Sequence, residues 1–74
     1  MTLSKEERKN IKEKLPIGAI SLIANRVGVS RMSVYNYLKG RFRNLEIEKE
    51  VIEMYCDILK QEKELRSKIE DAKQ

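Results

Sequence analysis

The sequence predicts an all-α fold in which three short helices form a core and a long fourth helix follows them. Apolar residues recur at helical spacing, and residues suited to N-cap positions precede the segments that contain them. Three glycines and one proline separate the segments, and none of them occurs after Gly40. A chain of 74 residues suits one small domain that buries only about 60% of its unfolded surface, so oligomerisation is expected.

The first helix is predicted over residues 4–14. Ser4 begins an S-x-x-E sequence, the form of a capping box in which a serine hydroxyl and a glutamate carboxylate bind the first backbone N–H groups. Ile11 falls on the inner side of this helix. Pro16 and Gly18 then stop the helix and turn the chain.

Two further helices are predicted over residues 19–26 and 31–39, joined by a tight turn. Gly28 suits a left-handed turn position because it has no Cβ atom to clash. Ser30 can cap the following helix by accepting a backbone N–H. Ala24 provides a small side chain where the two helices cross.

Two short helices joined in this way form a helix-turn-helix, whose second helix has the size that fits a DNA major groove. The alternative is a plain helical hairpin in a bundle core. Both interpretations place the same apolar residues inside, where they hold the two helices at a fixed angle: Ile23, Ala24, Val27, Val29, Val34 and Leu38.

The fourth helix is predicted over residues 45–74, because Gly40 ends the third helix, Asn44 can cap the next one and no later Pro or Gly interrupts it. A heptad seam, which Glu62 interrupts, follows 4-3 spacing along this segment: Val51, Tyr55, Ile58, Glu62, Leu65, Ile69 and Ala72.

The chain therefore divides into a core, residues 1–59, and a C-terminal extension of the fourth helix, residues 60–74. The extension has two interpretations. It can be a solvated helix rich in i, i+4 ion pairs, or it can be a coiled coil that pairs two copies of the chain. We expect dimerisation through the fourth helix.

Charge is distributed unevenly along the chain. Residues 1–43 hold ten Lys or Arg and three acidic side chains, whereas residues 44–74 hold six and nine. No acidic residue occurs from Lys14 to Leu45. A polyanion such as DNA would be attracted to this stretch and repelled by the acidic segment.

Composition argues against several other functions. Cys56 is the only cysteine and the chain has no histidine, so neither a disulfide framework nor a zinc site is expected within one chain. No nucleophile–base pair or phosphate loop occurs, so we expect no enzyme activity, no metal and no cofactor. The apolar runs are too short to span a membrane and the first ten residues contain no apolar signal region, so a cytoplasmic protein is expected. The role of Cys56 stays open.

The residues Ile23-Ala24, Gly28-Val29-Ser30 and Ser33-Val34 resemble the core of bacterial and phage repressor helix-turn-helix domains, of the lac-repressor or lambda-repressor type. The resemblance covers about residues 16–59. It implies sequence-specific binding of double-stranded DNA in transcriptional control, as a small repressor of a bacterium, phage or mobile element. The matching positions identify the fold better than they identify the operator.

In lac-type proteins the first, second and sixth residues of the second motif helix approach base edges. Carried over, these are Arg31, Met32 and Asn36. Arg can bond guanine, Asn can pair with adenine and Met can touch a thymine methyl group. Met32 departs from the lac-type pattern, which has a polar residue there. We expect contacts to the DNA backbone from five further residues: Ser33, Tyr35, Lys39, Arg41 and Arg43.

Two other functions remain as alternatives. The chain could be an accessory DNA-binding factor of a mobile element, such as an excisionase-like or replication-control protein. It could also be a helical adaptor whose fourth helix docks a protein partner. The basic residues of the first helix, among them Arg8 and Lys12, are expected to be ordinary surface charge, and Tyr37 and Tyr55 are expected in the core.

Overall fold

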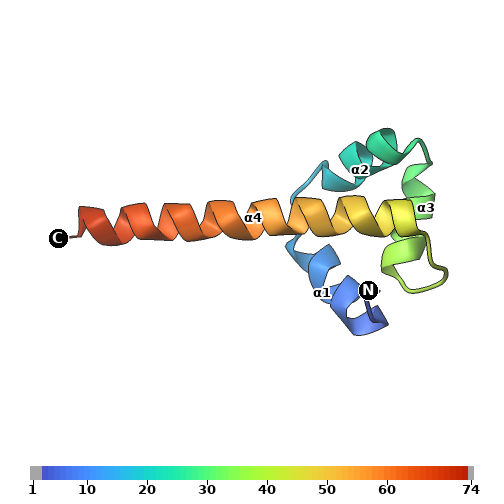
Figure 1. Ribbon diagram of the computed structural model, residues 1–74, viewed down its shortest axis with the longest axis horizontal. Coiled ribbons are helices and arrows are strands. Elements are labelled where there is room, and N and C mark those ends of the chain that lie inside the picture. Colours follow the sequence, from blue (N-terminus) through green and yellow to red (C-terminus); the bar gives the residue numbers. More distant parts are fainter. Residues whose placement is uncertain (1–2, 74) are drawn as a thin grey trace.

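The computed structural model describes residues 3–73, which form four helices and no strand (Figure 1). The three short helices lie around the first part of the long one, and the rest of the long helix extends away from them (Figure 1). The molecule is accordingly elongated, with extents of 48 × 23 × 18 Å. The expected all-α architecture is confirmed, with these helix bounds: α1 (Lys5–Lys14), α2 (Ala19–Val27), α3 (Arg31–Leu38) and α4 (Leu45–Ala72).

The predicted N-caps are all present. Ser4 Oγ accepts the Glu7 N–H, and Glu7 Oε1 accepts the Ser4 N–H, which completes the capping box of α1. The Ser4 backbone N–H, followed by the Ser4 side chain, hydrogen-bonds the Glu7 carboxylate and lowers its pKa, because these bonds favour the charged form. Ser30 Oγ accepts the Ser33 N–H, and Asn44 Oδ1 accepts two N–H groups of α4.

Gly28 adopts the left-handed conformation that the sequence predicts, with φ of 82°. Its N–H and that of Val29 both donate to the Ala24 carbonyl, which closes the end of α2. A Cβ atom at Gly28 would meet nothing within 4 Å. The requirement for glycine therefore comes from the backbone conformation and not from crowding. The helix bounds differ from the prediction by one residue, since α2 extends to Val27 and α3 ends at Leu38.

The core lies between the three short helices and the first half of α4. Four of the six predicted core residues are buried, and Val27 and Val29 are half-buried and pack against them. Tyr37 is fully buried and Tyr55 packs at the core edge, as expected. α2 contacts both α3 and α4, and α1 contacts α3. The buried hydrophobic residues are Leu3, Ile11, Ala19, Ile23, Ala24, Val34, Tyr37, Leu38, Ile47 and Val51.

Two charged side chains, Arg8 and Glu48, also lie in the core, with only 2% and 3% of their surface exposed. The expectation that Arg8 is ordinary surface charge is therefore wrong. Arg8 is three residues before the buried Ile11, so the two side chains share the inner face of α1. Glu48 Oε1 accepts the Leu3 N–H, which ties the start of the described chain to α4.

The second half of α4 makes no contribution to this core. Val51 is buried and Ile58 is half-buried, but every residue from Leu59 to Lys73 is exposed. The heptad face thus packs on the other helices in its first half and is bare in its second half. Gln74, the last residue of the predicted helix, is outside the described residues.

Candidate nucleic-acid interface

α3 has one buried face and one outward face. Val34, Tyr37 and Leu38 anchor it in the core. The remaining positions are exposed or half-buried, because side-chain direction along a helix repeats every three to four residues. Arg31 and Met32 are exposed, and Met32 exposes 65% of its surface. An apolar side chain at that exposure is not explained by packing within the chain.

Asn36, the third predicted base contact, is half-buried and is held by the loop that follows α3. Arg41 Nη1 donates to Asn36 Oδ1 over 3.4 Å. The Arg41 backbone N–H also donates to the Asn36 carbonyl over 3.0 Å. A predicted base contact and a predicted backbone contact therefore lie side by side.

Ser33 lies in the first turn of α3, where its hydroxyl forms a hydrogen bond with the hydroxyl of the N-cap residue Ser30. The Ser30 and Ser33 hydroxyl oxygens are 3.0 Å apart and either can donate. Because a hydroxyl has one donor and two acceptor positions, this contact leaves Ser33 free to make a further hydrogen bond. The assignment of Ser33 to a phosphate stays a prediction.

The loop after α3 carries the other predicted backbone contacts, Lys39, Arg41 and Arg43, and all three side chains are exposed. Gly40 has a φ of 80°, and two hydrogen bonds form around it. The Gly40 N–H donates to the Tyr37 carbonyl, and the Arg41 N–H donates to the Asn36 carbonyl. This pair of bonds forms a Schellman motif, which ends α3 and turns the loop sharply.

Tyr35 faces α1, where it meets a residue that sequence reasoning did not assign to the site. Lys12 Nζ lies 5.6 Å from the centre of the Tyr35 ring, within the range of a cation–π contact. Lys12 was expected to be ordinary surface charge. No periodicity within α1 could have indicated this contact, because it depends on how α1 packs against α3.

Lys12, Tyr35 and Arg31 border a shallow depression whose floor includes Ile20 and Ser21, at the start of α2. The N-cap of α2 is Gly18, which makes no side-chain cap, and no acidic residue occurs in the first turn. The positive end of a helix dipole therefore faces the same surface as two cationic side chains. Such an arrangement attracts an anionic group.

The predicted site residues thus lie on α3 and in the loop after it, and Lys12 of α1, which was not predicted, lies beside Tyr35. Within residues 3–73, no three His, Cys, Asp or Glu side chains are placed to hold a metal ion. No helix of this same region is long and apolar enough to cross a membrane.

No protein-family model, no curated protein and no solved structure matches this chain.

Proposed function

We propose that this chain binds double-stranded DNA in a sequence-specific manner, as a small cytoplasmic transcriptional regulator that inserts α3 in the major groove. The observation that carries the proposal is the outward face of α3. It presents Arg31, Met32 and Asn36, one side chain suited to guanine, one to a thymine methyl group and one to adenine.

The connection between α2 and α3 supports a helix-turn-helix. Three residues, Gly28 to Ser30, separate the two helices, and the glycine takes the left-handed conformation. Ala24, 3% exposed, keeps a small side chain in the core where α2 packs on α3. These features hold α3 rigidly against the core, which a helix needs if it is to read bases in a fixed register.

The charges around α3 support binding to the DNA backbone. Lys39, Arg41 and Arg43 follow the helix, and Lys12 and the uncapped start of α2 border a depression together with Tyr35 and Arg31. Positive groups beside a reading helix suit contacts to the phosphates that border a major groove. Together with the acid-free stretch of sequence, they predict an affinity that falls steeply with salt.

We infer that the regulator represses, because a domain of this size acts most simply by occupying an operator. An accessory factor of a mobile element would use the same surface. The two functions differ in where the bound site lies, and the geometry of α3 supports either.

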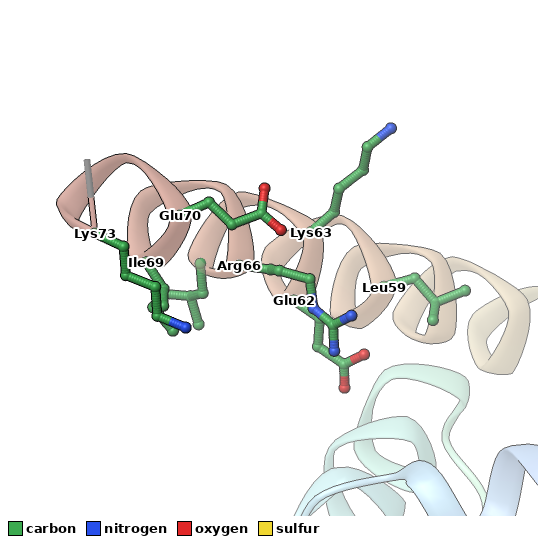
Figure 2. A pocket seen from close by; sticks show the side chains of 8 residues that line it. Leu59, Glu62, Lys63, Arg66, Ile69, Glu70 and Lys73 are labelled. Carbon is green, nitrogen blue, oxygen red and sulfur yellow. The ribbon is translucent and has the colours of Figure 1, made fainter.

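We further propose a homodimer through α4. Leu59, Leu65 and Ile69 are 41%, 60% and 57% exposed along the free part of the helix. Figure 2 shows Leu59 and Ile69 on this segment, with Glu62, Arg66 and other charged side chains around them. A second copy would cover the apolar residues, and the charges between them favour a pairing of modest strength.

The experiment that tests this function is a selection of bound sites from random DNA duplexes. The wild-type protein is expected to enrich one sequence, with a two-fold repeat if it binds as a dimer. Lys63→Ala is the matched control, because it removes a positive charge from α4 far along the chain from α3. The control should enrich the same sequence, whereas Arg31→Ala should relax one base position. A wild-type protein that enriches nothing at low salt would refute the proposal.

A further inference from the structure

Arg8 joins the segment before α1 to the end of α3 and to the loop that follows it. Its Nε donates to the Leu3 carbonyl, and its Nη1 donates both to the Tyr37 carbonyl and to the Phe42 carbonyl, each over 3.1 Å. The guanidinium also lies over the Tyr37 ring, 4.6 Å from its centre. Through a single nitrogen, Arg8 therefore connects the end of α3 to the middle of the loop that follows it.

These bonds explain how a positive charge is tolerated in the core. Three of the five guanidinium donors are satisfied by backbone carbonyls, and the ring face of Tyr37 adds a favourable electrostatic contact. The Tyr37 carbonyl belongs to the last turn of α3, where the helix dipole favours a cation. The hydrogen-bond partners of Arg8 are backbone carbonyls, so this arginine fixes the course of the backbone around it.

A second contact from α1 acts on the same loop. A Cβ atom added to Gly40 would lie 2.5 Å from Lys5 Cγ, so the Lys5 side chain covers the turn closely. Lys5 and Arg8 are one helical turn apart on α1. The loop is therefore held at Gly40 by packing and at Phe42 by a hydrogen bond.

The contacts of Lys5 with Gly40 and of Arg8 with Phe42 act on the cationic part of the loop. Phe42 stands between Arg41 and Arg43, two of the three exposed cationic residues that follow α3. A carbonyl fixed between them limits the directions in which both side chains can leave the backbone. Lysine in place of Arg8 would keep the charge but has one nitrogen, and it lacks the planar fork that reaches Leu3, Tyr37 and Phe42 together.

We propose that Arg8 is a positioning residue for DNA binding: it fixes residues 41–43 so that Arg41 and Arg43 face the phosphate backbone. The part of the inference that concerns DNA rests on the proposed function. The part that concerns the loop does not.

The first test reads the loop without DNA. Amide hydrogen exchange is measured in the wild type, Arg8→Lys and Arg8→Met, with Ile11→Val as the matched control, because Ile11 is buried on the same face of α1 and is not one of the loop contacts. In the Arg8 variants the Gly40 and Arg41 amides should exchange about tenfold faster or more, while amides of α2 and α4 keep their wild-type rates. Ile11→Val should leave the loop unchanged. Equal acceleration throughout the chain, or none in the loop, would overturn the inference.

The second test is a double-mutant cycle on DNA, with affinities corrected for the folded fraction. Arg41→Ala with Arg43→Ala should lower the salt slope of binding by about 1.8, for two phosphate contacts at about 0.9 each. Arg8→Lys should produce most of that loss alone, and adding the two alanines should then change little.

Additive losses in the cycle would show that Arg8 does not act through the loop. A wild-type protein without measurable DNA affinity would instead refute the proposed function, while the exchange rates would still decide whether Arg8 holds the loop.

Discussion

The guanidinium of Arg41 contacts the side-chain oxygen of Asn36, at 3.4 Å, across the sharp turn that ends α3. The contact brings a residue suited to phosphate next to a residue suited to a base. It also occupies the Asn36 oxygen, so adenine recognition by Asn36 requires Arg41 to move or to share this atom. The proposed binding of adenine by Asn36 would therefore replace or share the hydrogen bond from Arg41.

Replacing Arg31 or Asn36 should change specificity more than affinity for random DNA. Each alanine variant is expected to lose about 1–3 kcal/mol on the preferred site and to relax one base position, because a bidentate base contact disappears. Competition binding against selected and scrambled duplexes measures this. Equal losses on both duplexes would mean that the two residues touch only phosphate.

Arg43→Ala should weaken binding to all sequences alike. Removing one phosphate contact lowers the slope of log affinity against log salt by about 0.9. Titrations at several salt concentrations, with Lys63→Ala as a control for net charge, give this slope. A slope that equals the wild-type value would place Arg43 away from the backbone.

The turn between α2 and α3 should accept asparagine better than valine at Gly28. The left-handed backbone at φ of 82° costs an ordinary side chain about 1–2 kcal/mol, and a β-branched one more. Gly28→Val is therefore expected to lower the melting temperature by roughly 8 °C or more, and Gly28→Asn by less. Thermal melts of both variants that coincide with the wild type would contradict the turn.

Tyr37 should make the protein sensitive to alkali. Burial raises the pKa of Tyr37 above its ordinary value of 10.0, and the nearby Glu48 carboxylate raises it further, while Arg8 and Arg43 oppose the shift. The raised pKa belongs to the folded state, so the neutral Tyr37 side chain contributes fully to the free energy of unfolding below pH 10. This contribution is lost as the pH rises beyond 10.

Tyr37→Phe removes this sensitivity. The buried Tyr37 hydroxyl lies near Glu48 but has no hydrogen-bond partner among the described residues. Its removal should therefore lower the free energy of unfolding by less than about 1 kcal/mol at pH 7. Denaturant unfolding of both proteins at pH 7 and at about pH 11 gives the comparison. A difference in stability that does not change between these pH values would refute the assignment.

Removing residues 60–74 should leave a folded core that no longer dimerises. Every described residue of this segment is exposed, so its loss is expected to change the unfolding free energy of the core by less than about 1 kcal/mol. Operator affinity should fall, because a single half-site holds the protein weakly. Sedimentation of the two proteins measures the association. A full-length chain that stays monomeric at tens of micromolar, with and without DNA, would favour a different protein partner for α4.

Local signals in the sequence predict most of the fold. Ser4, Ser30 and Asn44 mark the helix starts and Gly28 and Gly40 mark two of the ends, because capping and left-handed turns depend only on neighbouring residues. The limits of α2 and α3 differed by one residue, since helix ends fray.

The site could be predicted only in part. The outward face of α3 follows from periodicity, whereas the contacts of Lys12 with Tyr35 and of Arg8 with Phe42 join residues 23 and 34 positions apart. Contacts at such separation depend on how helices pack. The position of Arg8 on the Ile11 face of α1 was the one local sign that this arginine points inward.

Chemical-shift mapping of the labelled protein with a DNA duplex tests the central claim most directly. Shifts are expected to concentrate at residues 31–36, in the loop at 39–43, and near Lys12 and the start of α2. Amides beyond Leu59 should move little when the duplex is added. Shifts that concentrate on α4, or that are absent at low salt, would contradict the assignment of α3 as the surface that reads DNA.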